Sequence, residues 1–315
     1  MSATRPLHWA EIGEVTSVNG IRALCFVHRR LGRLPFLLCL YPVVLFHWLA
    51  RPAARRASID YLRRADAASP GLFRRRPGRW QSLRHLAAFG DTLLTKIIAC
   101  GGGYPSDRVE LSREVMLTQL RGGEGGVIVT AHLGCLELTQ ALAREVPGLR
   151  VTVLVHTAHA ERFNRLLERL DSGDALRLQQ VTELGPATAV MLGERVARGE
   201  FVAIAGDRVP LRGGRSVSAR FLGAEARFPI GPYVLAAALG CPLFAMSCLR
   251  TARGYGIAFE RLADRVVLPR GSRAEALAGY AATYAGWLQD QVRKSPLDWF
   301  NFYDFWEGAD DGRNG

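Results

Sequence analysis

Short apolar runs alternate with helical stretches through the middle of the chain, and this alternation limits the possible folds more than any other feature. The strand-like runs are 127–131, 150–155, 175–180 and 201–205, and helical spacing separates them. Strand–helix–strand repeats form parallel sheets, because a parallel connection needs a crossover. The pattern therefore predicts an α/β fold with a mostly parallel or mixed sheet flanked by helices.

Further elements are expected after the last of these strands. Residues 212–220 are rich in Gly, Ser and Arg and should form a loop. Two strands, 243–249 and 255–261, should pair as a hairpin at the edge of the sheet. A capping-box pattern at residues 272–275 should open a long helix. The segment 296–306 has too many aromatic residues for a free tail, so we expect it to pack back onto the domain.

The N-terminal part of the chain is apolar and basic. Residues 7–33 mix apolar and arginine side chains in the manner of a basic amphipathic helix, and residues 34–50 carry no formal charge. The second stretch is short for a spanning helix, which needs about 20 apolar residues. The arginine-dense segment 51–79 is typical of a region beside an anionic membrane. The pattern favours membrane association, by spanning or by lying on the surface, over the alternative of a buried core hairpin.

These patterns divide the chain into a membrane-associating helical segment (1–56), a basic linker (57–79), an α/β domain (80–306) and a flexible tail (307–315). The net charge of +12 predicts an anionic partner, such as a membrane surface or an acidic carrier protein. The sequence contains no nucleic-acid recognition motif, so nucleic acid is not expected as a partner. Its six cysteines form no CxxC pair, which indicates neither a disulfide framework nor a metal site.

The clearest candidate for chemistry is His132, which follows the strand 127–131 directly. Glu137 lies five residues later, and on one continuous helix the two side chains would point roughly 140° apart. A turn at Gly134 changes this, and we expect the Glu137 carboxylate to reach one imidazole nitrogen while the other nitrogen faces the substrate. Asp207 and Arg208 follow the strand 201–205 and should face the same cleft, because ligands bind at the carboxyl ends of parallel strands.

Four motifs together resemble a known group of enzymes. The stretches A-H-L-G-C-L-E, G-D-R, F-L-G-A-E-A-R-F-P and P-L-D-W-F-N-F-Y are similar to those of the lysophospholipid acyltransferase superfamily. Within it, the chain most resembles the bacterial lipid A biosynthesis (lauroyl/myristoyl) acyltransferase family, over roughly residues 15–306. The resemblance implies a membrane anchor, no cofactor, and a place on the cytoplasmic face of the cell inner membrane. It also implies transfer of a fatty acyl group from an acyl carrier protein or acyl-CoA thioester to a hydroxyl of a lipid or lipid-like acceptor.

The resemblance also implies roles for single residues. His132 would be the general base and Glu137 the carboxylate that orients it. Asp207 would position the surroundings of His132 or the acceptor, and Arg208 would bind phosphate or pantetheine; a loop-stabilising ion pair of these two residues is the alternative. Backbone amides near Gly134, or a nearby arginine, would stabilise the oxyanion. Two further residues, expected to line the acyl pocket, are Phe221 and Gly223.

The sequence departs from the family where a Tyr-Arg-Pro-x-Asn stretch is usual. This chain has His156, Arg162 and Asn164 in that region, and they are candidates for binding the substrate instead. The departure leaves the acceptor open. Two alternatives remain beside the acyltransferase: a non-catalytic membrane lipid-binding protein with the same fold, and a Cys135 nucleophile, which is less favoured because free cysteines usually pack in the core.

Overall fold

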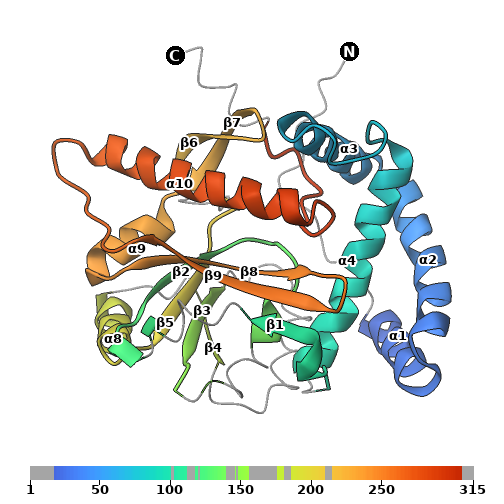
Figure 1. Ribbon diagram of the computed structural model, residues 1–315, viewed down its shortest axis with the longest axis horizontal. Helices are drawn as coiled ribbons and strands as arrows, with labels where there is room; N and C mark the ends of the chain where they lie inside the picture. Colours follow the sequence, from blue (N-terminus) through green and yellow to red (C-terminus); the bar gives the residue numbers. More distant parts are fainter. Residues whose placement is uncertain are drawn as a thin grey trace.

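The structure is a computed structural model, and it describes residues 18–100, 103–111, 118–119, 121–139, 146, 148–155, 176–180, 186–209 and 215–306. Within these residues a mixed sheet lies beside a bundle of N-terminal helices, and α10 (Arg273–Lys294) crosses one face of the sheet (Figure 1). The expected α/β architecture is confirmed.

The main sheet has seven strands in the described residues, in the order β1-β9-β8-β2-β5-β3-β4. In chain order the strands are β1 (Val109–Leu111), β2 (Gly126–Thr130), β3 (Val151–Val155), β4 (Leu176–Gln180), β5 (Phe201–Ala205), β8 (Leu243–Arg250) and β9 (Tyr255–Ala263). Strand β2 lies in the middle and pairs in parallel with β5 on one side and β8 on the other. Every residue of β2 is buried, so this strand is a rigid support for the residues that follow its carboxyl end.

The β8–β9 hairpin forms as expected, with antiparallel pairing from Leu243 to Ala263. It does not form the edge of the sheet, because the short strand β1 pairs in parallel with the outer side of β9. The helix expected after the capping-box pattern is α10. Ser272 occupies its N-cap position, but its side chain makes no capping hydrogen bond.

The region expected to be a loop at 212–220 contains a strand instead. Strand β6 (Ser216–Phe221) pairs antiparallel with β7 (Ala224–Pro229), and Leu222 and Gly223 form the turn with φ of 47° and 85°. Its Ser and Arg residues alternate with buried ones such as Ala219, so polar composition concealed a strand that is apolar on one face only.

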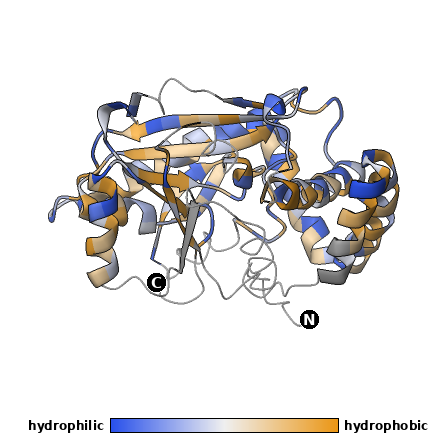
Figure 2. Cartoon of the chain, turned by 90° about the horizontal axis from the view of Figure 1, so that it is seen from below, coloured by the Kyte–Doolittle hydropathy of each residue, from blue (hydrophilic) through white to orange (hydrophobic). Residues whose placement is uncertain are grey.

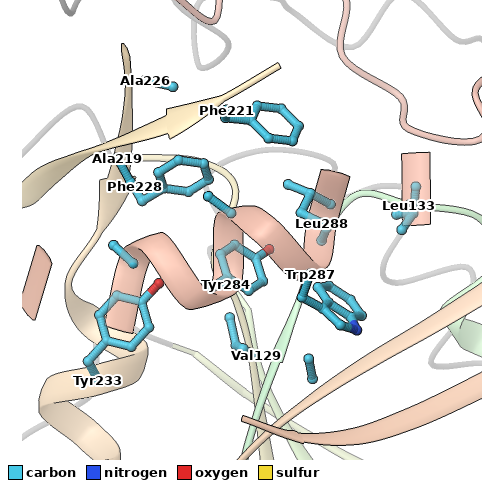
Figure 3. Packing of buried hydrophobic residues seen from close by; sticks show 14 of the residues in the cluster. Val129, Leu133, Ala219, Phe221, Ala226, Phe228, Tyr233, Tyr284, Trp287 and Leu288 are labelled. Atoms are coloured by element: carbon cyan, nitrogen blue, oxygen red, sulfur yellow. The ribbon is translucent and has the colours of Figure 1, made fainter. Parts of the chain in front are cut away.

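The hairpin belongs to the main core. Figure 3 shows side chains of α10 lying between this hairpin and the strand that carries Val129. Phe228 meets the Tyr284 ring edge-on at 5.8 Å, and α9 (Gly231–Leu239) adds Tyr233. Helix α9 ends at Gly240, which adopts the left-handed conformation. Helix α8 (Pro186–Ala197) follows β4, contacts α9 and β5, and adds Leu192 and Val196 to the same core.

Four helices form the N-terminal bundle: α1 (Val18–Leu31), α2 (Arg33–Ala50), α3 (Pro52–Ala68) and α4 (Arg79–Cys100). Helix α2 turns Phe36, Leu40 and Val44 inward against α4. The segment expected as a basic linker begins inside α3, which packs closely: its Tyr61 is fully buried in the same core cluster as the central strands. The bundle is therefore continuous with the α/β core through α3 and α4.

Candidate active site

His132 stands two residues after Thr130, the last residue of the central strand β2, and the backbone turns sharply two residues later. Gly134 has φ of +66°, and a Cβ atom there would lie 1.8 Å from the carbonyl oxygen of Cys248. Only glycine fits this position without moving β8. Asp207 follows β5, the parallel neighbour of β2, and Gly206 N–H donates to the Thr130 carbonyl at 2.8 Å. The two strand ends therefore bring His132 and Asp207 together, as the sequence predicted.

The Asp207 carboxylate holds His132 at two points. Its Oδ1 lies 2.8 Å from His132 Nδ1, and its Oδ2 accepts the backbone N–H of His132, also at 2.8 Å. The Asp207 side chain is 2% exposed, whereas that of His132 is 40% exposed. Within the described part of the chain, Nε2 on the opposite edge of the ring has no hydrogen-bond partner. The imidazole thus has one anchored nitrogen and one nitrogen free to meet a substrate.

The charges in the pair follow from this geometry. Burial raises the pKa of Asp207, but His132, Arg208 and the donated hydrogen bonds outweigh it and lower that pKa to about 2. Burial and the positive charge of Arg208 lower the pKa of His132. The negative charge of Asp207 raises it, but not enough to cancel these two effects. At neutral pH the carboxylate is therefore ionised and the imidazole neutral. An ionised Asp207 accepts Nδ1–H, which assigns the lone pair to Nε2.

Glu137 has a different partner from the one expected. It lies in the short 3₁₀ helix Leu136–Leu138, and its Oε1 accepts a hydrogen bond from Lys96 Nζ on α4 at 2.8 Å. The contact with an imidazole nitrogen that the spacing predicted is made by Asp207 instead. The physical reason is the left-handed turn at Gly134, which directs the following residues toward α4.

Lys96 is a charged residue of the site that is not among the residues predicted from the sequence. Burial opposes its charge, but Glu137 outweighs this and raises the Lys96 pKa, so the ammonium remains protonated. Its charge reaches the imidazole and contributes to lowering the His132 pKa. A signal was present: the sequence has two lysines, Lys96 and Lys294, among many arginines, and Lys96 lies in an otherwise apolar stretch of helix.

Two backbone amides expected to bind an oxyanion are already engaged. Gly134 N–H donates to the Asp298 carbonyl at 2.8 Å, and Cys135 N–H donates to the Cys248 carbonyl at 3.0 Å. The expectation was wrong for these two groups, because the segment after His132 uses its amides to bind β8 and the C-terminal segment. The Cys135 side chain is fully buried, and burial raises the pKa of its thiol well above the ordinary value. This confirms Cys135 as a core residue.

The C-terminal segment Pro296–Trp306 packs back onto the domain, as expected, and reaches the site itself. Trp299 Nε1 donates to Asp207 Oδ2 at 3.0 Å, and Phe300 N–H donates to the His132 carbonyl at 2.8 Å. The Tyr303 hydroxyl donates to the Asp207 carbonyl at 3.3 Å. The aromatic residues are evident in the sequence, but no local pattern places them beside His132.

An ionic network around the buried carboxylates of Asp91 and Asp298 holds the start of this segment. The Arg250 guanidinium, at the end of β8, pairs with Asp91 of α4 and lies 3.3 Å from Asp298 Oδ1. The Arg250 backbone N–H also donates to Asp298 Oδ2 at 2.8 Å. Arg33, at the start of α2, contacts the same Asp91 at 2.9 Å. The network links the N-terminal bundle, the sheet and the segment that crosses the site.

The remaining predicted site residues fall into three groups. Arg208 lies beside the pair; its Nη2 donates to the Phe300 carbonyl at 3.2 Å, and its guanidinium lies 5.8 Å from the centre of the Tyr303 ring. Phe221 is fully buried and stacks on Trp306, while Gly223 lies in the β6–β7 turn. The residues outside the described part of the chain are His156, Arg162 and Asn164.

Sequence comparisons agree with the motifs. A family model described as bacterial lipid A biosynthesis acyltransferase matches residues 107–307. This range includes His132, Glu137, Asp207 and the C-terminal segment up to Trp306. No curated protein matches the chain. Since the match extends over more than half of the 315 residues, the chain belongs to the bacterial lipid A biosynthesis acyltransferase family, which supports acyltransferase activity.

Proposed function

We propose that this chain is a membrane-associated O-acyltransferase that moves a fatty acyl group from an acyl thioester to a hydroxyl of a lipid or lipid-like acceptor. The observation that carries the proposal is the neutral His132 imidazole, anchored by an ionised Asp207 at Nδ1 and free at Nε2. A base of this kind, with a pKa below its ordinary value, is unprotonated at neutral pH and ready to accept a proton.

The transfer proceeds by direct attack. His132 Nε2 accepts the proton of the acceptor hydroxyl as its oxygen attacks the thioester carbonyl, and a C–O bond forms. The tetrahedral intermediate then expels the thiolate, which breaks the C–S bond. The thiolate takes the proton from the His132 imidazolium, so the products are an ester and a free thiol. Asp207 stabilises the imidazolium during the step, because it remains ionised beside Nδ1.

Lys96 and Glu137 form a second charged pair that supports the reaction. Glu137 holds the Lys96 ammonium at 2.8 Å, and the charge of Lys96 is felt at His132. With the amides of Gly134 and Cys135 engaged, a cation close to the base is the natural stabiliser of the developing oxyanion. We assign this electrostatic role to Lys96, with Glu137 as the residue that positions it. Arg208 is the second cation at the site and is the candidate for binding a phosphate or the pantetheine of the donor.

The donor is an acyl carrier protein or acyl-CoA, and the net charge of +12 suits either anionic donor. The acceptor is a hydroxyl-bearing lipid or lipid-like molecule. Family membership supports this class of substrate. The segment that contains His156, Arg162 and Asn164 is where this chain departs from the family's usual residues, and we propose that it helps to select the acceptor.

The N-terminal helices suit a protein that works at a membrane, and we place it on the cytoplasmic face of the inner membrane. Helix α2 is long and apolar enough to cross a membrane by length and composition. One side of it packs on α4, while the other exposes Leu34, Leu38, Phe46 and Leu49. Figure 2 shows hydrophobic residues gathered along these helices. Because its inner side is already packed, we propose that α2 lies on the bilayer surface with its exposed side in the lipid.

The catalytic proposal is tested with His132→Ala. The assay supplies acyl carrier protein or CoA thioesters and a lipid extract, and mass spectrometry identifies the acylated products. We expect the purified variant to lose acyl transfer in this assay. Its thermal unfolding and vesicle binding should match those of the original protein. Full activity in His132→Ala would refute the proposed role of the base. Vesicle binding without thioester turnover in the unaltered protein would favour the non-catalytic lipid-binding alternative.

A further inference from the structure

The C-terminal segment contributes a side chain directly to the His132–Asp207 pair. Trp299 follows α10 and the short link at Pro296, and lies far from both residues in the sequence. It forms an isolated antiparallel bridge with Leu133, which places its side chain beside the strand ends. Its indole Nε1–H donates to Asp207 Oδ2 at 3.0 Å, and the side chain is 1% exposed.

Within the described residues, three donors meet the Asp207 carboxylate, and they are divided between its two oxygens. Oδ1 faces the imidazole Nδ1, whereas Oδ2 accepts from both the His132 backbone N–H and the Trp299 indole. Two donors on one oxygen fix the plane of a carboxylate that would otherwise rotate about its last torsion. The backbone donor belongs to His132 itself, so the indole is the donor that comes from a separate element.

The Trp299 ring has its own fixed position. It meets the rings of Tyr61, Phe221 and Phe305 edge-on, with centroids 4.9, 5.2 and 5.0 Å away. These residues come from α3, β6 and the end of the C-terminal segment. The indole N–H is therefore aimed by packing from several sides, which is the requirement for a group that holds another group in place.

We propose that Trp299 is a positioning residue of the acyl-transfer site, whose indole N–H sets the orientation of the Asp207 carboxylate and through it that of His132. The inference rests on the proposed function and adds to it: the site is complete only when the C-terminal segment is docked. Trp299 does not touch the reacting atoms, and it acts through Asp207.

The proposal predicts how the base responds when this donor is lost. The charged and titratable groups around the pair are Arg208, Lys96 with its partner Glu137, Tyr284 and Tyr303. None of these is altered by Trp299→Phe. Asp207 keeps the His132 backbone N–H and stays beside the ring, but with one donor fewer its negative charge acts more strongly on the imidazolium. The pKa of His132 therefore rises in this variant.

The chain offers a matched control in Trp306→Phe. Trp306 lies in the same aromatic cluster and also donates its indole N–H to a buried acceptor, the Phe221 carbonyl at 3.2 Å. The exchange of tryptophan for phenylalanine is the same in both variants, and only Trp299 donates to Asp207. The Trp306→Phe control therefore measures the effect of losing tryptophan packing from this cluster, which both variants share.

We expect Trp299→Phe to lower kcat by about tenfold with little change in KM, and to move the acid limb of the kcat/KM profile to higher pH. The same rise in pKa should appear in an NMR titration of isotope-labelled histidine, with the His132 signal identified by its loss in His132→Ala. Trp306→Phe should leave both the kcat and the titration unchanged.

The two readouts separate this inference from the proposed function. If the unaltered protein transfers no acyl group from a thioester, the proposed function fails. The NMR titration then still tests whether the Trp299 indole orients Asp207 and thereby changes the pKa of His132. If Trp299→Phe and Trp306→Phe give the same kcat and the same His132 pKa, or if the pKa falls in Trp299→Phe, the positioning role is overturned.

Discussion

At the scale of single residues, the two carboxylates of the site bind different partners. Asp207 is buried, ionised and bound to both the ring and the backbone of His132. Glu137 lies nearer the surface and is paired with Lys96. In the proposed mechanism, His132 is the base and Glu137 holds Lys96, while Asp207, which orients the base, follows a different strand. This division predicts that the two carboxylates differ in their effect on catalysis.

Asp207→Asn and Glu137→Gln test that difference. Asparagine at 207 removes the charge that stabilises the imidazolium and favours the wrong tautomer, so we expect kcat to fall by roughly 10³- to 10⁴-fold. Glutamine at 137 leaves the Asp207–His132 contact intact and weakens the hold on Lys96, with a loss of about tenfold. Steady-state kinetics on both variants measure the effects. A larger loss in Glu137→Gln than in Asp207→Asn would return the orienting role to Glu137.

At the scale of elements, a buried histidine joins two helices to the C-terminal segment. The Nδ1 atom of His85, on α4, lies 3.0 Å from the Ser58 hydroxyl of α3. Its Nε2 atom lies 2.9 Å from the Trp299 carbonyl oxygen. Its ring also lies 4.5 Å from that of Phe302. Burial lowers the pKa of His85 to about 4, so the ring is neutral and donates to Trp299 through Nε2–H. The packing of α3 and α4 thereby supports the segment that carries Trp299.

His85 should make the stability of the fold depend on pH. Its folded-state pKa lies below the unfolded value of 6.5, so the unfolded chain binds the proton first as the pH falls. The contribution is present above about pH 6.5 and is lost as the pH approaches 4, a change of roughly 3 kcal/mol. Urea unfolding at pH 7, 5.5 and 4 measures it. His85→Gln should flatten this decline; an equally steep decline in that variant would assign it to other groups.

At the scale of the whole molecule, the N-terminal bundle connects an exposed apolar surface to the site. Helix α2 exposes apolar side chains outward and packs inward on α4, and α4 carries both Lys96 and Asp91. Arg55 stacks on Trp48 at 4.7 Å near the end of α2, in the manner of a membrane-interface anchor. If α2 lies on the bilayer, the helix that bears Lys96 forms the next layer of the structure.

Exposed apolar residues on α2 and elsewhere allow a controlled test of membrane binding. The double variant Leu38→Asp, Phe46→Asp changes side chains that are 75% and 66% exposed, and we expect it to bind vesicles at least tenfold more weakly, since each buried apolar side chain contributes about 1.5–3 kcal/mol. Val190→Asp, Val267→Asp makes the same change on α8 and after β9, at 64% and 56% exposure, and should bind normally.

Co-sedimentation with vesicles of phosphatidylethanolamine and phosphatidylglycerol measures this binding, and thermal unfolding verifies that each variant is folded. Equal binding by the two double variants would mean that another surface meets the membrane. Deleting α1 and α2 is a less specific experiment, because it would also uncover Leu94 and the neighbouring apolar residues of α4.

Local pattern was sufficient for much of the fold. Strand β5 has the predicted bounds, because a short buried strand leaves a continuous apolar run in the sequence. His132 and Asp207 were placed at the same edge of the sheet by the rule that parallel strands share their carboxyl ends. Strand β6 was missed because its polar face dominated its composition.

The tertiary structure alone decided which groups meet. The order β8-β2-β5 makes Asp207 the neighbour of His132, and the left-handed Gly134 directs Glu137 to Lys96. Trp299 reaches Asp207 from 92 residues further along the chain. The sequence by itself determined most of the elements and the candidate site residues His132 and Asp207, since these follow from local patterns. The partners of the base depend on strand order, one backbone turn and the docking of a distant segment, which only the folded chain specifies.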